Sequence, residues 1–180
     1  ASQLATTAPD VVVYMCTAGS FKEGQDGNEE IKDQLRRITG CSNVTTTSEA
    51  VIEGMKALGL KRIAMLTPYD EDITRREIEF LGFHGIGVAD FHYRDIEDNL
   101  DRGAIPPDDS FRHALDLDYA SADGLFLSCA NVPAIQVIDT LEERTGKPVV
   151  TSNQATVWKS LRLAGVADPI PGYGALLRDF

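Results

Sequence analysis

Short apolar runs alternate with amphipathic segments along this chain of 180 residues. The apolar runs have the length of buried strands, and the amphipathic segments show the 3.6-residue period of helices. This alternation predicts an α/β fold with a parallel sheet and helices on both of its faces. We expect strands over 11–15, 62–66, 86–93 and 125–128, and helices over 29–38, 49–58, 70–81 and 108–117.

Capping residues set the expected ends of several helices. Gly40 stops the first long helix, and Ser48 is a natural N-cap for the helix that follows it. Asp70 or Asp72 can begin the helix after the second strand. The charged stretch over 95–107 predicts an irregular loop.

Two parts of the chain resemble each other. Cys16 and Cys129, 113 positions apart, each follow an apolar run. The segments 40–59 and 146–165 each run from glycine to glycine and match at an offset of 106. A duplication with a seven-residue insertion explains both offsets. Chance is the alternative, because βα units in general share apolar strands and C-terminal glycines.

A duplication predicts two pseudosymmetric parallel-sheet halves, residues 1–60 and 61–180, with the last helix able to pack back on the first half. A strand and helix block over 61–123 precedes the cysteine strand of the second half, whereas only residues 1–10 precede that of the first. Symmetry therefore predicts a first half that lacks its leading strand and helix block. Its cysteine strand should have fewer neighbours than the strand over 125–128. A first half that is smaller by design is the alternative.

Composition narrows the class of protein. Hydrophobic residues make up 43% of the chain and charged residues 25%, as in an ordinary globular protein. The net charge of −11, with Lys and Arg scattered, argues against a nucleic-acid partner. We find neither an apolar run long enough for a membrane span nor the pattern of a signal peptide. Three cysteines are too few for a disulfide framework, so we expect a cytoplasmic protein with reduced thiols; homo-oligomerisation stays open.

The placement of Cys16 and Cys129 suggests chemistry. In parallel sheets, ligands bind at the carboxyl ends of the strands, which is where both cysteines are expected. A helix that begins directly after each cysteine would favour the thiolate. Two thiols across one cleft suit a reaction that needs a nucleophile or a proton on both faces of a small substrate. A buried structural role is the alternative for each, and we assign Cys41 to structure.

Five further residues are candidates for substrate binding. Thr17, Ala18 and Ala130 are small, so backbone N–H groups there could approach a carboxylate closely. Tyr69 is expected at the same sheet edge, with a surface turn as its alternative, and Asn99 reads locally as a turn residue. We find no Cys/His cluster and no glycine-rich phosphate loop, so we expect neither a metal nor a nucleotide cofactor. The absence of a GxSxG motif argues against a serine hydrolase.

The chain resembles the maleate cis-trans isomerase branch of the aspartate/glutamate racemase superfamily, which also includes arylmalonate decarboxylase. The resemblance extends from Val11 to the closing Pro171-Gly172-Tyr173-Gly174 and includes the segments 44–48, 62–69, 98–99 and 129–133. It implies an active site between two α/β halves and no cofactor. It also implies that Cys16 is the nucleophile and Cys129 the acid/base.

The resemblance also assigns the binding residues. It places Thr17, Ala18 and Ala130 at backbone positions that cradle carboxylates, Tyr69 at a carboxylate-binding tyrosine and Asn99 at a pocket asparagine. Amino-acid racemases of the superfamily carry Cys-Asn-Thr and Gly-Cys-Thr where this chain has Cys-Thr-Ala and Ser-Cys-Ala. Arylmalonate decarboxylase carries glycine at the position of Cys16.

These features together predict an enzyme, a cofactor-independent isomerase of a small dicarboxylate, with maleate to fumarate as the leading reaction. A two-thiol racemase or an arylmalonate-type decarboxylase is the alternative among enzymes. An inactive remnant or a small-acid binding module is the alternative from another class.

Overall fold

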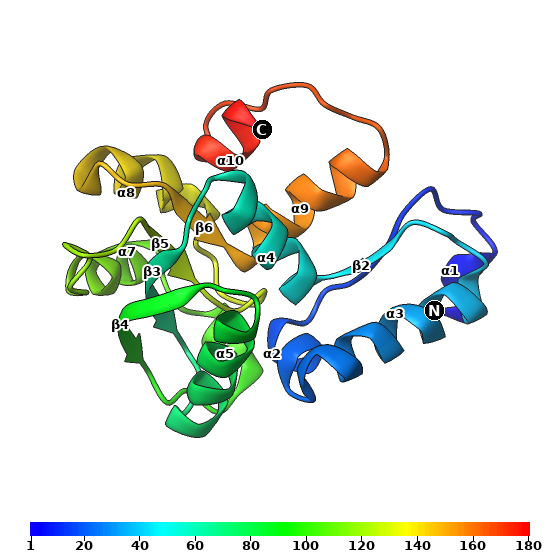
Figure 1. Ribbon diagram of the computed structural model, residues 1–180, viewed down its shortest axis with the longest axis horizontal. Coiled ribbons are helices and arrows are strands. Elements are labelled where there is room, and N and C mark those ends of the chain that lie inside the picture. Colours follow the sequence, from blue (N-terminus) through cyan, green and yellow to red (C-terminus); the bar gives the residue numbers. More distant parts are fainter.

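Two parallel sheets form the framework of the computed structural model, which describes residues 1–180 (Figure 1). One sheet has two strands in the order β1-β2, and the other has four in the order β4-β3-β5-β6. Every strand pair is parallel, which confirms the predicted α/β class. The strands are β1 (Val12–Tyr14), β2 (Val44–Thr46), β3 (Arg62–Thr67), β4 (Gly87–Tyr93), β5 (Gly124–Leu127) and β6 (Val149–Thr151).

Helices connect the strands and cover both sheets. In Figure 1, α3 and the two-stranded sheet lie on one side and the four-stranded sheet on the other, with α4 and α9 between them. The helices are α1 (Ser2–Ala5), α2 (Thr17–Phe21), α3 (Gly24–Thr39), α4 (Thr47–Ala57), α5 (Glu71–Phe83), α6 (Asn99–Gly103), α7 (Pro107–Leu115), α8 (Ile138–Thr145), α9 (Ser152–Leu163) and α10 (Ala175–Asp179), with a 3₁₀ turn over Ile135–Val137.

The helix ends correct two expectations. Thr46, not Ser48, caps α4: its hydroxyl accepts a hydrogen bond from the Glu49 N–H at 3.2 Å, whereas Ser48 is buried against Ser20. The stretch over 95–107 is not wholly irregular, because the Asp98 carboxylate caps the short helix α6. The predicted cap at Asp70 is confirmed by its bond from the Ile73 N–H at 2.7 Å.

The strand register supports the duplication but shifts its alignment. Tyr14 lies opposite Thr46 in one sheet, and Leu127 lies opposite Thr151 in the other. Thr46 and Thr151 also cap α4 and α9 in the same way. The structural offset between β2 and β6 is thus 105, so the expected 106 was wrong there. With 113 between β1 and β5 and 106 between the C-cap glycines Gly40 and Gly146, the seven-residue difference holds up to the end of the intervening helix. One further residue in the loop before β2 gives 105, and the extra residue in α9 restores 106 at the closing glycines.

The two halves differ in their strands and share one core. β1 pairs only with β2, whereas β5 pairs with both β3 and β6, which confirms that the first cysteine strand has fewer neighbours. The Thr156 hydroxyl of α9 donates to the Thr47 hydroxyl of α4 at 3.3 Å, and Lys159 pairs with Glu53. Buried side chains from both halves form one hydrophobic cluster. The division at residue 60 stays a prediction.

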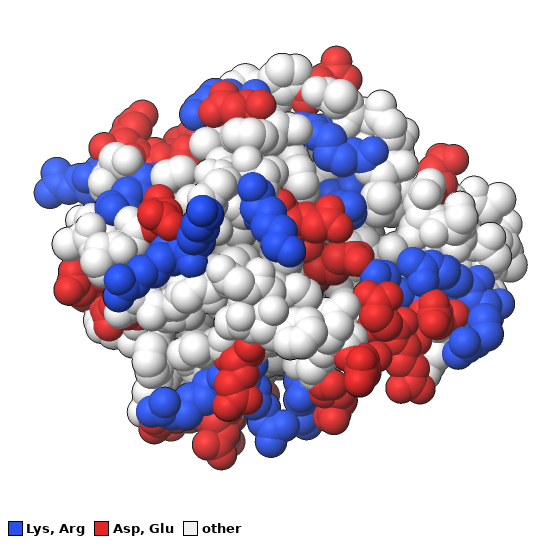
Figure 2. Space-filling view, in the orientation of Figure 1, with Lys and Arg blue, Asp and Glu red and all other residues white.

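Charges on the surface are mixed. On the face drawn in Figure 2, Lys and Arg side chains are interspersed with Asp and Glu around uncharged surface, without a continuous basic area. None of the helices is both long and apolar enough to cross a membrane.

The capping box formed by Thr151 and Gln154 at the start of α9 can be tested by mutation. Thr151→Ala should lower the free energy of unfolding by about 1 kcal/mol relative to Thr151→Ser, because serine retains the hydroxyl that accepts from the Gln154 N–H at 3.1 Å. Both variants lose the methyl group, so the difference between them isolates the cap. Urea unfolding measures it, and equal stability of the two variants would contradict the assigned cap.

Candidate active site

One cavity gathers all seven residues proposed from the sequence. It has a volume of about 360 Å³ and lies where β1, β3 and β5 end, with α6 along one side. Its location follows from parallel pairing, which directs the carboxyl ends of neighbouring strands to one edge of a sheet. The lining residues are Met15, Cys16, Thr17, Ala18, Tyr69, Asn99, Arg102, Cys129, Ala130 and Asn131. Cys41 lies outside this cavity, as expected.

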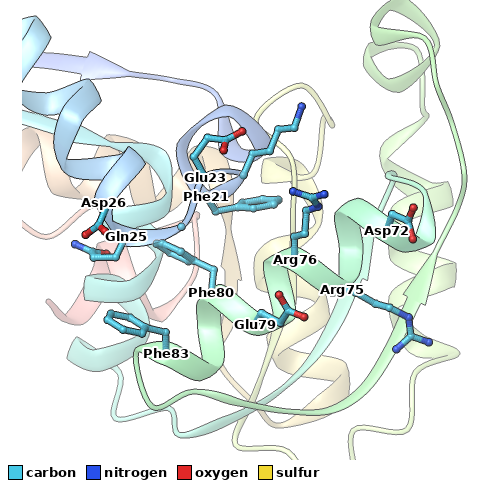
Figure 3. Close-up of a pocket in the computed structure, with 12 residues that line it drawn as sticks. Phe21, Glu23, Gln25, Asp26, Asp72, Arg75, Arg76, Glu79, Phe80 and Phe83 are labelled. Atoms are coloured by element: carbon cyan, nitrogen blue, oxygen red, sulfur yellow. The ribbon is translucent and has the colours of Figure 1, made fainter.

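A larger cavity of about 730 Å³ lies elsewhere, between α5 and the segment that joins α2 to α3 (Figure 3). Phe21 and Phe80 line it together with acidic and basic side chains, and the centroids of these two rings are 6.4 Å apart. It contains neither cysteine of the repeat.

Cys16 lies at the N-cap position of α2 and is exposed to solvent. Its thiol is next to the Tyr14 hydroxyl, and burial together with this thiol raises the pKa of Tyr14. Gly19 allows that arrangement, because a Cβ there would lie 3.0 Å from the Cys16 Sγ and 2.6 Å from the Tyr14 hydroxyl oxygen. The glycine therefore keeps the space beside the thiol open.

Cys129 is buried, and its backbone has a conformation that side chains rarely adopt. Its φ is 89°, which costs a non-glycine residue on the order of 1–3 kcal/mol. The bond from its N–H to the Ser152 hydroxyl, at 3.0 Å, helps to hold this turn. The first helical turn after it begins only at Ile135, so the expected helix directly after each cysteine is found for Cys16 but not for Cys129.

Tyr69 faces the second cysteine from the end of β3. Its side chain is 2% exposed, so the alternative of a surface turn is wrong. Burial raises the pKa of Tyr69, and the nearby Glu77 carboxyl and Cys129 thiol raise it further. The phenol therefore stays protonated and is available as a hydrogen-bond donor beside Cys129.

A hydrogen bond across the cavity joins the two halves of the chain. The Ala130 N–H donates to the Thr17 hydroxyl at 3.0 Å. Ala130 thus lines the cavity as expected, but its N–H is already engaged and is not open to a carboxylate. The Thr17 hydroxyl accepts this bond and retains its own proton for a ligand.

Three lining residues were not anticipated. Met15 and Asn131 adjoin predicted residues, and Arg102 follows Asn99 by three positions in α6. The Arg102 side chain reaches back to the Asn99 side-chain oxygen at 3.3 Å. This i, i+3 spacing could have been used to find Arg102 had a helix been expected within 95–107.

A buried carboxyl group lies behind the cavity. Glu77 of α5 is 2% exposed, and one of its oxygens accepts a hydrogen bond from the Ser128 hydroxyl at 2.6 Å. Its other oxygen has no partner. Burial raises the pKa of Glu77 to about 8. No group of three or more His, Cys, Asp or Glu side chains lies in an arrangement that could hold a metal ion.

Comparison with known proteins identifies the family of the chain. The family model described as arylmalonate decarboxylase matches residues 1–177. The chain belongs to the arylmalonate decarboxylase family. It is 33% identical to arylmalonate decarboxylase from Bordetella bronchiseptica over 173 residues, which cover 94% of this chain and 71% of that protein. It is 30% identical to maleate isomerase from Geobacillus stearothermophilus over 182 residues, with 98% and 72% covered.

A solved structure of this family has nearly the same fold. It is a Cys-to-Ser mutant of Nocardia farcinica maleate cis-trans isomerase with a covalently bound succinylcysteine intermediate. It superimposes with a TM-score of 0.94 at 26% identity and covers 99% of this chain and 75% of that one. Relatives and structure together confirm the branch of the superfamily that the sequence resembles, and they are consistent with pseudosymmetric halves.

The buried carboxyl makes stability depend on pH. The pKa of Glu77 is about 8 in the folded protein, against about 4.3 in an unfolded chain. Between these values the unfolded state releases the proton and the folded state keeps it, so the free energy of unfolding falls as pH rises from about 4 to 8. Glu77→Gln should therefore gain stability over wild type across this window, by on the order of a few kcal/mol.

Chemical unfolding at several pH values measures this difference. Glu79→Gln is the matched control, because Glu79 is exposed on the same helix. Its difference from wild type should hardly change with pH. A Glu77→Gln difference that is likewise constant would refute the neutral buried carboxyl.

Proposed function

We propose that this chain is a cofactor-independent, cysteine-dependent isomerase that converts maleate to fumarate. The arrangement of Cys16 and Cys129 around one cavity, each from a different half, carries the proposal. The succinylcysteine of the Nocardia farcinica enzyme supports it, because addition of a thiol across the double bond of maleate yields a succinyl group on sulfur.

Cys16 acts as the nucleophile. Its thiolate adds to one alkene carbon of maleate and forms a C–S bond, while the π electrons move to the other alkene carbon and its carboxylate. Cys129 then donates the thiol proton to that second carbon. The product of the two steps is a succinyl group on Cys16, and Cys129 is left as a thiolate.

Rotation and elimination complete the reaction. The former double bond is now a single bond, so the two carboxylates can rotate to the trans arrangement. The Cys129 thiolate removes the proton it gave, the double bond re-forms, and the C–S bond breaks. This sequence releases fumarate and restores the Cys16 thiolate and the Cys129 thiol, so that atoms and electrons balance.

Polar groups around the cysteines hold the carboxylates. The Tyr69 hydroxyl, kept protonated by burial, donates to a carboxylate near Cys129. The Thr17 hydroxyl and the Ala18 N–H, in the first turn of α2, donate near Cys16. Ala130 acts through the bond that orients Thr17, and Asn99 contributes its amide at the open side of the cavity. Homo-oligomerisation and a cytoplasmic location stay predictions from the sequence.

Substitution of each cysteine tests the roles. Cys16→Ser should abolish conversion of maleate to fumarate, because a serine hydroxyl is a far weaker nucleophile at neutral pH. Cys129→Ser should lower kcat by about 10²–10⁴-fold, the usual contribution of a general acid/base. Cys41→Ser is the matched control and should retain activity, since Cys41 lies outside the cavity.

Mass spectrometry of the intact protein gives an independent measure. Wild type incubated with maleate should gain the mass of one maleate, located on Cys16 by peptide mapping, and Cys16→Ser should not. Isomerase activity that survives in Cys16→Ser would refute the nucleophile. Solvent deuterium entering a substrate without an adduct would indicate a two-base racemase, and release of CO₂ from an arylmalonate would indicate a decarboxylase.

A further inference from the structure

A single charged side chain lines the cavity. Among the ten lining residues, Arg102 carries charge, and Lys, Asp and Glu are absent. The proposed substrate has two carboxylates, and the whole chain has a net charge of −11. A dianion that leaves water for such a protein needs a nearby cation to offset its lost hydration. Arg102 is the cation that this cavity offers.

The guanidinium of Arg102 is held in place by neutral groups. Its Nε donates to the Ile96 carbonyl at 2.7 Å, and its Nη1 donates to the Asn99 side-chain oxygen at 3.3 Å. Its Cζ lies 5.1 Å from the centre of the Tyr69 ring. None of these contacts is with a carboxylate, so the positive charge of Arg102 is not neutralised within the protein.

These contacts leave the Nη2 group of the guanidinium without a partner. Nη2 makes no hydrogen bond to the protein, while the bonds at Nε and Nη1 and the stacking on Tyr69 restrict the rotation of the side chain. An arginine fixed in this way loses little conformational entropy when it binds a planar carboxylate. Tyr69 also faces Cys129, so the Arg102 guanidinium and the Cys129 thiol both lie beside the Tyr69 side chain.

We propose that Arg102 binds one substrate carboxylate and makes the site select dicarboxylates over analogues with a single carboxylate. This inference rests on the proposed function for the identity of the substrate, but the preference itself is a property of binding. A hydrogen bond to a charged partner contributes enough to change affinity by about 10- to 100-fold. The preference for a second carboxylate should be of that size.

Binding of two matched ligands tests the proposal without turnover. Succinate has two carboxylates, and succinamate has the same shape with one carboxylate replaced by an amide. Isothermal titration calorimetry on the whole chain should show wild type binding succinate about 10-fold or more tightly than succinamate. In Arg102→Gln this ratio should fall to about 1, because the glutamine amide no longer distinguishes the two groups.

Two further variants separate charge from packing. Arg102→Lys keeps the positive charge but loses the planar guanidinium, so it should retain part of the preference for succinate over succinamate. Arg112→Gln is the matched control and should keep the wild-type ratio, because Arg112 is exposed on α7 and pairs with Asp109. Circular dichroism and thermal unfolding confirm that each variant is folded.

The outcomes are distinct. If wild type shows no preference for succinate, or if Arg102→Gln weakens both ligands equally, Arg102 does not select the second carboxylate and the inference is overturned. The proposed function is judged separately, by conversion of maleate in wild type. Failure of that reaction with an intact succinate preference would leave a dicarboxylate-binding protein.

Discussion

The hydrogen bond from the Ala130 N–H to the Thr17 hydroxyl is the contact on which the site depends. β1 and β5 belong to separate sheets, so no ladder of strand pairing sets the distance between the residues that follow them. This bond connects the two halves at the cavity, and contacts between α4 and α9 connect them a second time. The bond fixes the two turns that carry Cys16 and Cys129 relative to each other, while the common hydrophobic core holds the two sheets together.

The cavity combines neutral donors with one cation. Burial keeps the Tyr69 phenol protonated and raises the pKa of Glu77, so neither brings negative charge to the site at neutral pH. Arg102 then faces an environment of hydroxyl, amide and thiol groups. In such surroundings a cation interacts more strongly with a ligand carboxylate than it would beside protein acids. No Asp or Glu side chain lines the cavity itself.

The unusual backbone at Cys129 shows how the fold positions this thiol. A φ of 89° is unfavourable for cysteine, and glycine would relieve it. Hydrogen bonds hold the turn in this conformation. The Ser152 hydroxyl accepts from the Cys129 N–H, and the preceding Ser128 donates to the Glu77 carboxyl and to the Leu66 carbonyl. Ser128 directly follows β5 and Ser152 begins α9, and both serines are buried. The surrounding structure thus holds the thiol at the cavity wall at the expense of local strain.

The sequence by itself determined the parallel α/β class and the repeat, and its local pattern marked six of the seven predicted residues that meet in the cavity. Asn99 came from the resemblance to the maleate isomerase branch, because its local sequence is that of a turn. Apolar runs, glycine stops and cysteines at strand ends are local signals, and parallel strands convert them into a common edge. The tertiary structure decided the repeat register, the helix around Asn99, the engagement of the Ala130 N–H, and the presence of Arg102 and Glu77. Strand pairing sets the register, the Asp98 cap forms the helix, and contacts between distant segments place the rest. The contacts between distant segments leave no periodic signal in the chain, so no local pattern could have revealed the engagement of the Ala130 N–H or the burial of Glu77. The Asp98 cap is a local signal, and with it the helix around Asn99 and the i, i+3 position of Arg102 were open to prediction.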